Sequence, residues 1–427
     1  MELAVLLGLF AFCVAIGVPV AFALGISAIV VFWLEGLPLM IAFQRILSGV
    51  SVFSLLAIPF FIFAGELMLH GGIAQRLVRL AAAAVGHVRG GLGTVNVFSS
   101  MLFGGISGSA VADTSALGSL LIPVMKRRGY DADYAVNVTV TSSIAGILIP
   151  PSHNMILYAV AAGGGVSISK LFLAGVVPGI LMCVCLAVAA YLVALRRGYP
   201  KEAFPGWAAL GMACVSAFPG LVTAIIIVGG VLSGVFTVTE SGAIGCIYAL
   251  LITTLAYRSL SWSDFTLAVA RAVRTTALVM ILVGCATAFA YLLALYRVPE
   301  QLTGLLFAIS ENPIVILLML NLMLLLLGMI MDMAALILIC TPIFLPVAVS
   351  LGMDPIQFGM IMMMNLGLGL TTPPVGACLF VGCAIGKTPM EKVLRTIWPF
   401  YLAIFVALML TTYVPAISMT LPNTFIR

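Results

Sequence analysis

Two double prolines set in apolar stretches are the part of this sequence that most directly suggests chemistry. They end the runs Gly-Ile-Leu-Ile-Pro-Pro (146–151) and Gly-Leu-Thr-Thr-Pro-Pro (369–374). Because proline has no N–H, each proline deprives the carbonyl four residues earlier of its helical hydrogen bond. We therefore expect four carbonyls without helical partners: Gly146, Ile147, Gly369 and Leu370.

Unpaired carbonyls at membrane depth are tolerated where they line a cavity or bind an ion. The two motifs therefore predict two equivalent cation sites. The alternative is a pair of proline kinks, healed by neighbouring helices or by Ser and Thr side chains. We favour cation sites because the double proline occurs twice, in each case after a broken apolar segment.

Polar residues in those two broken segments could complete the sites. The first reads Gly-Gly-Ile-Ser-Gly-Ser-Ala-Val-Ala-Asp over 104–113, and the hydroxyls of Ser107 and Ser109 could bind a hard cation or a substrate. Asp113 in this run and Asp332 in the second segment are carboxylates inside apolar spans, which are functional candidates by default. The structural alternative for each is an N-cap at the start of a helix.

Three further polar groups receive plainer interpretations. His153 and Asn154 follow the first double proline, where they could line a polar path. Glu240 closes a Thr-Val-Thr-Glu run typical of a capping box. Glu66 lies one helical turn from His70, so the two could pair.

The composition places the chain in a membrane. Of its 427 residues 63% are hydrophobic and 8% charged, with a mean hydropathy of +1.27, whereas soluble proteins carry about 25% charged residues. This excludes soluble enzymes, nucleic-acid binders and disulfide scaffolds. No catalytic constellation, P-loop or metal-ligand spacing occurs, so we expect no enzyme and no metal other than a coupling ion. An intramembrane hydrolase using Asp113 and Asp332 is the alternative, and it requires those side chains to meet.

Apolar segments long enough to span a bilayer, about 20 residues, recur along the chain. The segment 3–33 is too long for one span, and predicts two short crossings or one long tilted helix. The methionine-rich run 360–364 is expected to pack in the core. Segments 91–125 and 313–348 are long but broken, and we interpret them as re-entrant helical hairpins. The remaining candidate spans are 52–69, 135–162, 171–195, 207–232, 236–257, 275–296, 358–386 and 397–417.

An internal repeat organises these segments. When Gly105 is placed on Gly328, the stretch 105–151 aligns with 328–374 without a gap, and seven of the nine identities among 47 positions are Gly, Pro or Asp. This repeat alignment predicts two repeats, 1–203 and 204–427. Each would contain a hairpin (91–125 or 313–348) followed by a broken helix (135–162 or 358–386).

The charges predict that the repeats are inverted. The loop at 126–128 is Lys-Arg-Arg, whereas the corresponding loop of the second repeat, around 350–352, has no basic residue, so the positive-inside rule places the two loops on opposite sides. The resulting topology puts 15 of the 19 basic residues inside. Those left outside are Arg45, Lys170, Arg297 and Arg427.

Several motifs together resemble the large membrane subunit of the tripartite ATP-independent periplasmic (TRAP) transporters, and the resemblance runs from end to end. Many members have proline where this chain has Val238, and Ser-Ile-Pro where it has Ser152-His153-Asn154. The motifs are Gly-Val-Pro (17–19), Leu-Leu-Ala-Ile-Pro-Phe-Phe (55–61), Ser-Gly-Ser-Ala-Val-Ala-Asp (107–113), Ile-Pro-Pro-Ser (149–152), Thr-Val-Thr-Glu (237–240) and Thr-Pro-Pro-Val-Gly (372–376).

The resemblance implies an elevator-type, sodium-coupled secondary transporter in the bacterial cell inner membrane. Arm helices would form a fixed scaffold, and the hairpins would belong to a moving transport domain. The implied substrate is a small organic acid, such as a sialic acid, sugar acid or dicarboxylate, delivered by a periplasmic substrate-binding protein. The implied membrane partner is a small four-helix subunit, expected as a separate chain. The alternative is a self-sufficient sodium/anion symporter that needs no binding protein.

The resemblance also implies the residues of the sites, with sodium ions as coupling ions and no other cofactor. The two sodium sets correspond to each other in the repeat alignment. Ser107, Ser109, Asp113, Asp332 and Asn154 would shape the sites or meet the solute. The implied sodium-binding residues are Gly105, Gly146, Ile149 and Ser152 in the first site, and Gly328, Gly369, Thr372 and Val375 in the second.

Overall fold

The computed structural model describes residues 2–426, and within that range the chain forms helices and no β-strand. Six helices are long and apolar enough to cross a membrane, or eight if each of two bent pairs counts as one span. The predicted all-α, polytopic membrane fold is therefore confirmed. Arg427, assigned to the outer side above, lies outside the described residues.

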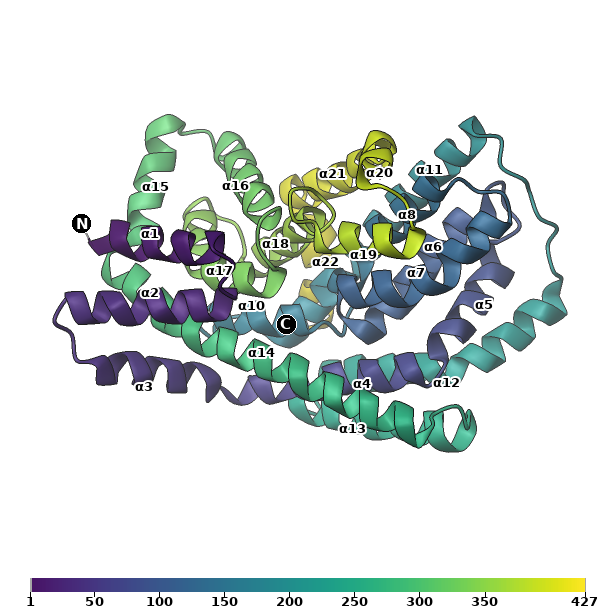
Figure 1. Ribbon diagram of the computed structural model, residues 1–427, viewed down its shortest axis with the longest axis horizontal. Helices are drawn as coiled ribbons and strands as arrows, with labels where there is room; N and C mark the ends of the chain where they lie inside the picture. Colours follow the sequence, from purple (N-terminus) through teal and green to yellow (C-terminus); the bar gives the residue numbers. More distant parts are fainter. Residues whose placement is uncertain (1, 427) are drawn as a thin grey trace.

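The segment 3–33 forms two separate helices, which answers the question left open by the sequence. Helices α1 (Glu2–Ala15) and α2 (Val20–Leu34) pack against each other (Figure 1). Gly17, with a φ of +87°, and Pro19 form the turn between them. A left-handed φ suits glycine, and proline cannot continue a preceding helix, so these two residues explain the break.

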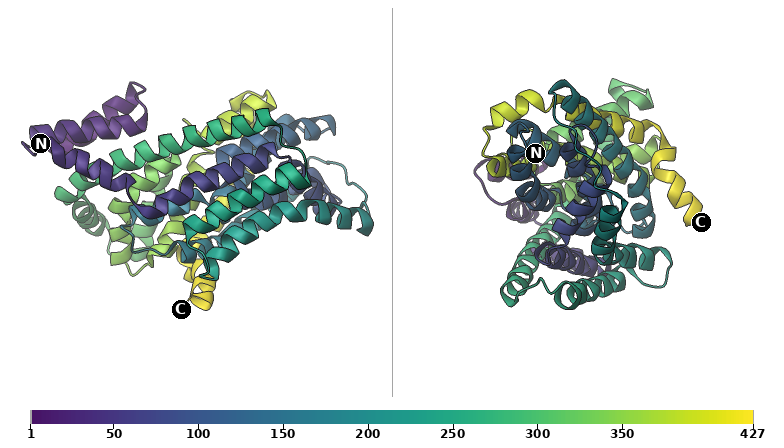
Figure 2. Two further views of the ribbon diagram at one scale, coloured as in Figure 1. Left: turned by 90° about the horizontal axis from the view of Figure 1, so that it is seen from below. Right: turned by 90° about the vertical axis from the view of Figure 1, so that its right-hand side faces the viewer.

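One side of the molecule is a layer of helices that includes the long helices α12 and α14, and it is called the long-helix layer below. A short 3₁₀ turn, Phe53–Leu56, links α3 to α4. Helices α13 and α14 pack against α4, and α12 packs against α13. Figure 2 (left) shows them as a row of slanted rods. Their bounds are α3 Leu39–Val50, α4 Ala57–His70, α12 Trp207–Leu232, α13 Val238–Leu251 and α14 Trp262–Leu295.

Helix α14 is longer than the predicted span 275–296. It begins at Trp262, because Ser261 and Asp264 form a capping box that starts the helix well before the apolar run. A second such box, Thr237 with Glu240, starts α13 and confirms the structural interpretation of Glu240. Sequence hydropathy marks the apolar part of a helix, whereas its start is determined by the cap.

The first half of the chain contributes a helical hairpin and an interrupted helix to the interior of the molecule. The hairpin is α6 (Gly91–Ser107) with α7 (Ala110–Arg127), preceded by α5 (Ile73–Val85). The interrupted helix is bent by 54° at its break. Its pieces, and the long helix that follows, are α8 Ala132–Ser142, α9 Ala145–Leu148, α10 His153–Ala161 and α11 Ile168–Arg196.

The second half repeats this order after α15 (Val298–Ile309). Helices α7 and α17 start and end at corresponding positions of the repeat alignment, and α8 and α18 start in the same register. The inverted orientation of the repeats stays a prediction. The remaining helices are α16 Pro313–Gly328, α17 Met333–Ser350, α18 Pro355–Gly369, α19 Ala377–Gly386, α20 Met390–Thr396, α21 Trp398–Tyr413 and α22 Pro415–Phe425.

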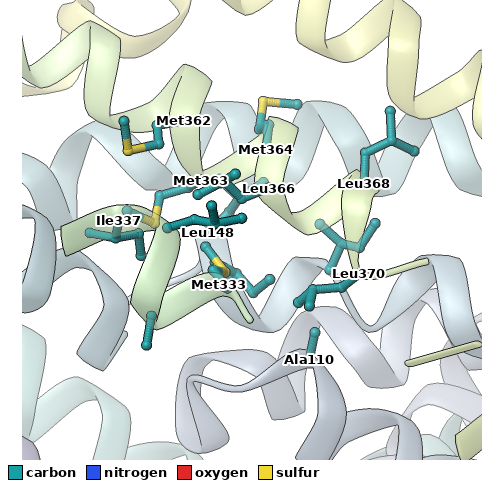
Figure 3. Close-up of a cluster of buried hydrophobic side chains, with 14 of the residues drawn as sticks. Ala110, Leu148, Met333, Ile337, Met362, Met363, Met364, Leu366, Leu368 and Leu370 are labelled. Carbon is teal, nitrogen blue, oxygen red and sulfur yellow. The ribbon is translucent and has the colours of Figure 1, made fainter. Parts of the chain in front are cut away.

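In each half, the helix that follows the break packs against the hairpin of the other half. Helix α10 of the first half packs against α17 of the second hairpin, and α19 packs against α7 of the first hairpin. Figure 3 shows the shared core, where Leu148, Met333 and Leu370 lie close together beside the methionines of α18. Met360 and Met362–Met364 are fully buried, which confirms their predicted role in packing.

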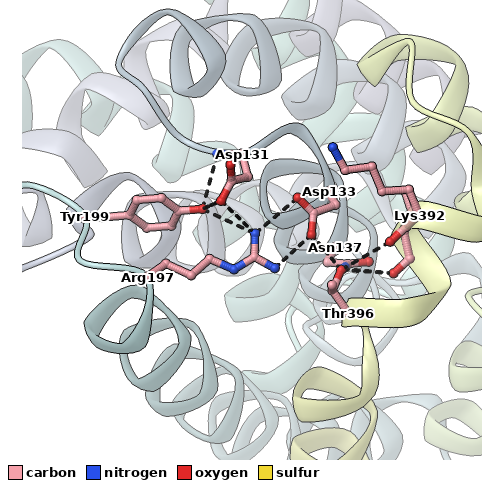
Figure 4. A network of polar contacts seen from close by, with 8 residues as sticks. Asp131, Asp133, Asn137, Arg197, Tyr199, Lys392 and Thr396 are labelled. Atoms are coloured by element: carbon pink, nitrogen blue, oxygen red, sulfur yellow. Dashed lines mark hydrogen bonds and ion pairs between the residues drawn. The ribbon is translucent and has the colours of Figure 1, made fainter.

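Polar loops gather at one end of the molecule. The Arg197 guanidinium binds Asp131 at 2.9 Å and Asp133 at 2.8 Å, while Tyr199 donates to Asp131 at 2.7 Å (Figure 4). The hydrogen bond with Asp133 raises the pKa of Arg197, and burial raises the pKa of Tyr199 to about 12. Thr396 of α20 also donates to Asp133, at 2.8 Å. The network thus joins three of the loops that the charges place inside.

Arg197→Ala should destabilise the protein, because it leaves Asp133, whose side chain is 4% exposed, without its charged partner. Removing one member of a buried ion pair costs about 3–5 kcal/mol. Since Arg197 is partly exposed, we expect the lower end of that range, measured as a fall in unfolding temperature. Arg196→Ala is the matched control, since its side chain is exposed, and it should change stability by no more than about 0.5 kcal/mol. Equal effects of the two changes would contradict the structural role of the network.

Candidate functional site

The first hairpin turns sharply at Gly108 and Ser109. Gly108 adopts a φ of +64°, and its N–H donates to the Gly104 carbonyl at 3.1 Å, which ends α6. Ser109 caps α7 by accepting a hydrogen bond from the Ala112 N–H at 3.4 Å. The N-cap of this helix is therefore Ser109, and the N-cap alternative for Asp113 is wrong.

Asp113 lies one turn into α7 and is completely buried. Ser107 donates a hydrogen bond to its Oδ1. Its Oδ2 has no hydrogen-bond partner among residues 2–426 and lies against Gly146, where an added Cβ would come within 2.3 Å of it. The Asp113 side chain therefore faces the first helix break.

The first hairpin tip lies in backbone contact with that break. A Cβ on Gly104 would be 2.5 Å from the Gly146 Cα, and one on Gly105 would be 3.0 Å from the Pro150 carbonyl oxygen. Asn154 fastens the tip by donating from Nδ2 to the Gly108 carbonyl at 3.2 Å. Glycine is required at 104, because a Cβ there would meet the Gly146 backbone, and at 146, because a Cβ there would meet the Asp113 carboxylate.

Ser152 stands at the N-cap position of α10, directly after the break, and is fully buried. Its Oγ has no hydrogen-bond partner among residues 2–426. Buried hydroxyls are normally paired, because an unpaired one costs about 1–3 kcal/mol. Together with Asp113, it gives the first break two buried oxygens that are free to bind a cation.

The second hairpin meets the second break in the same way. A Cβ on Gly369 would lie 2.4 Å from the Gly328 carbonyl carbon. The Val375 N–H donates to the Met329 carbonyl at 3.0 Å. Asp332 is the N-cap of α17 and accepts from the Ala334 N–H at 3.0 Å, so its capping interpretation is confirmed.

The four carbonyls expected to lack hydrogen bonds do so in the first double-proline motif but not in the second. In the second, the Gly369 carbonyl accepts from the Thr372 N–H at 2.9 Å and the Leu370 carbonyl from the Cys378 N–H at 3.0 Å. The expectation of unpaired carbonyls there is wrong, because the chain turns back at the break and α19 supplies a donor. In the first, no hydrogen bond to the Gly146 or Ile147 carbonyl is found among residues 2–426.

The two hairpin tips open onto one cavity of about 360 Å³. Ser109 from the first tip and Asp332 from the second both line it, and Asn154 and His153 lie between them. Thr275 of α14 closes the cavity from the long-helix layer. Three helices, α7, α10 and α17, begin at this cavity, and helix N-termini favour anions.

A second cavity, of about 290 Å³, adjoins the first and shares Ser109, His153 and Thr275 with it. Glu66 lines this cavity, and its Oε2 lies 3.6 Å from the His70 Nδ1, as the sequence spacing predicted. Sequence reasoning did not place Glu66 or Thr275 beside the hairpin tip. The one sequence signal for this position is that Thr275 is a polar residue within a long apolar helix, which is typical of a residue that faces a polar cavity.

The structure brings each predicted sodium set together at a tip and a break, and it gives the two aspartates different surroundings. Asp113 faces Gly146, whereas Asp332 lines the cavity between the tips. Each carboxylate has its own donor, Ser107 for Asp113 and the Ala334 N–H for Asp332, which does not favour the paired carboxylates of the hydrolase alternative. The oxygens available at the breaks are backbone, hydroxyl and carboxylate groups, the donors that hard cations prefer.

The comparisons with known proteins agree with this architecture. A sequence profile of the DctM component of the tripartite ATP-independent periplasmic transporters matches residues 7–417. The protein YgiK of Salmonella typhimurium is 42% identical over 99% of this chain and 97% of its own length. The sialic acid TRAP transporter large permease SiaM of Vibrio cholerae is 38% identical over 96% of both chains. The 2,3-diketo-L-gulonate TRAP large permease YiaN of Escherichia coli is 36% identical over 94% of both.

A solved structure shares the fold. The YdaH transporter of Alcanivorax borkumensis superposes with a TM-score of 0.68 over 90% of each chain, at 14% sequence identity. At this identity the likeness concerns the fold alone. The arrangement of the helices is therefore retained where most side chains differ.

Gly369→Ala should destabilise the protein, because the new Cβ would meet the Gly328 backbone at 2.4–2.7 Å. Overpacking of this kind typically costs about 1–3 kcal/mol, so the unfolding temperature should fall. Gly304→Ala in α15 is the matched control, since a Cβ there meets nothing within 4 Å, and alanine improves helix propensity by up to about 1 kcal/mol. If Gly369→Ala were as stable as the wild type, the close approach of tip and break would be disproved.

Proposed function

Because the chain belongs to the DctM-component family of TRAP transporters, we propose that it is the large membrane subunit that imports a small organic anion together with sodium ions. The solute class follows from relatives whose names specify sialic acid and 2,3-diketo-L-gulonate as substrates. The proposed location is the inner membrane of a bacterium, which the multi-pass fold suits.

The observation that carries this proposal is the cavity between the two hairpin tips. Its lining contains no Lys or Arg, yet three helices begin there. The start of α10 has no side-chain cap, whereas Ser109 caps α7 and Asp332 caps α17. Such ends act as partial positive charges and bind carboxylates without a full countercharge. Ser109 and Asn154 add neutral polar groups that could orient the solute, while Asp332 on the far side would disfavour a second negative group.

The sodium sites are proposed at the two breaks. The first would use Gly105, Gly146, Ile149 and Ser152, and its unpaired oxygens support a cation there. The second would use Gly328, Gly369, Thr372 and Val375. Thr372 donates from its Oγ1 to the Leu368 carbonyl at 2.8 Å, which leaves the lone pairs of that oxygen for the ion.

An elevator motion is the proposed mechanism. The hairpins and broken helices would move as one body, because their tips and breaks are joined by backbone contacts. The long-helix layer would remain fixed, and Thr275 and Glu66 lie where the two bodies meet at the cavities. Sodium bound between a tip and a break would order the tip, and thereby form the solute cavity. Such coupling must be reciprocal, so the solute should raise the affinity for sodium.

Two partners are proposed: a small four-helix membrane subunit and a periplasmic binding protein that delivers the solute. A relative from Oleidesulfovibrio alaskensis, the isethionate TRAP permease protein DctMQ, is 36% identical over 98% of this chain, which covers 66% of that relative. The extra length of DctMQ and its name support a permanent association between the large subunit and a second membrane component.

Transport is tested by reconstituting the large and small subunits in liposomes with radiolabelled sialic acid, 2,3-diketo-L-gulonate and C4-dicarboxylates. We expect uptake of one of these only with an inward sodium gradient and with the cognate binding protein outside. Replacing sodium by potassium should abolish it. Sodium-driven uptake at the full rate without the binding protein would instead identify a self-sufficient symporter.

Sodium binding is tested without any solute, by the unfolding temperature of the purified complex in sodium chloride against equal choline chloride. A ligand present at 100 times its Kd stabilises the folded state by about 2.7 kcal/mol, which should raise the unfolding temperature measurably. Thr372→Ala, which removes a proposed ligand at the second site, should reduce this rise. Stability that does not depend on the choice of cation at any concentration would refute sodium coupling.

A further inference from the structure

The two proposed cation sites differ in charge, although the sequence repeat predicts that they are equivalent. The repeat alignment that relates the sites pairs Asp113 with Leu336. Both side chains are buried, Asp113 completely and Leu336 with 1% of its surface exposed. The first half therefore places a carboxylate where the second half places a hydrocarbon.

The first break contains several buried oxygens without hydrogen-bond partners. The Asp113 Oδ2 and the Ser152 Oγ have none among residues 2–426, and neither do the Gly146 and Ile147 carbonyls. The Asp113 Oδ2 is directed at Gly146, the glycine that touches the hairpin tip. Ser107 accounts for the other carboxylate oxygen, so Oδ2 is the atom left for a ligand.

The second break is satisfied within the protein and more open. Hydrogen bonds reach the Gly369 and Leu370 carbonyls, and Val375 is 46% exposed. Its aspartate, Asp332, does not replace the missing charge, because it caps α17 and is exposed in the cavity between the tips. A cation at this break would interact chiefly with neutral dipoles.

We propose that Asp113 supplies the negative charge of the first cation site, and that this site therefore fills with sodium before the second and without solute. The inference rests on the proposed sodium coupling. A buried carboxylate with an unpaired oxygen is costly, and a cation beside it removes that cost. The second site gains no comparable relief, so it should bind sodium more weakly than the first site when no solute is present.

A purely structural role for Asp113 leads to different expectations. Its hydrogen bond from Ser107 could simply hold the turn at Gly108 and Ser109. In that case its removal would destabilise the protein equally in sodium and in choline. The charge role predicts that the effect of removal depends on the cation.

The experiment is a sodium titration of the unfolding temperature, at constant ionic strength with choline, for the purified large subunit with its small partner. Asp113→Asn keeps the shape and removes the charge. We expect it to be at least as stable as the wild type in choline, because it no longer buries an unpaired charge. The sodium concentration for half-maximal stabilisation should rise by about tenfold or more, a change equivalent to about 1.4 kcal/mol.

Two further variants complete the test. Asp264→Asn makes the same chemical change at a partly exposed helix start, where it retains a capping side chain, and should leave the sodium response unchanged. Thr372→Ala should retain the stabilisation at low sodium and lose only the part at high sodium. As a check on the turn itself, Ser107→Ala removes the donor to Asp113 and keeps the charge, so it should lower stability in choline and retain a sodium response.

The outcomes separate the inference from the function on which it rests. If sodium does not stabilise the wild type, the sodium coupling itself fails. If the wild type responds and Asp113→Asn responds identically, or loses the same stability in both salts, the role of Asp113 is overturned. Loss of the low-sodium response in Thr372→Ala, with retention in Asp113→Asn, would reverse the proposed order of filling.

Discussion

The close approach of two backbones, repeated once in each half of the chain, is the constraint on which the structure depends. Gly104 lies against Gly146, and Gly369 against Gly328, so closely that a Cβ on Gly104 or Gly369 would be within 2.5 Å of the facing backbone. Each contact brings a hairpin tip to the point where a helix is interrupted. The interruption is possible inside a membrane only because the hairpin covers it. Glycine on both sides therefore allows tip and break to share one small volume.

The cavity between the tips follows from how the halves are packed together. Each helix after a break contacts the hairpin of the other half, so the two tips face a common space. The core that holds them there is apolar and methionine-rich, and adapts to the irregular shape of the breaks (Figure 3). The proposed recognition of an anion then rests on helix ends and a few side chains. A full positive charge, which would be costly to bury, is not needed.

The two halves have similar backbones but different side chains, and the side chains place the negative charge differently in the two hairpins. The corresponding bounds of α7 and α17 in the repeat alignment show how closely the backbones agree. The charge in the first hairpin lies one turn inside the helix, whereas in the second it lies at the cap. For the two proposed sodium sites, unequal affinity would impose an order on binding. The solved YdaH structure, with the same fold at 14% identity, is consistent with a backbone that tolerates such changes.

The sequence by itself determined the membrane class, the two hairpins, the two interrupted helices and the residues at each break. It could do so because hydrophobic length, proline and glycine act locally, and because the repeat places them twice in register. Only the tertiary structure decided which carbonyls stay unpaired, where the Asp113 carboxylate points, and that Thr275 and Glu66 reach the tip. The Leu370 carbonyl shows the reason, since its donor is on α19 beyond the turn of the break. Whether a buried polar atom is satisfied depends on groups brought near by folding, and no local pattern records them.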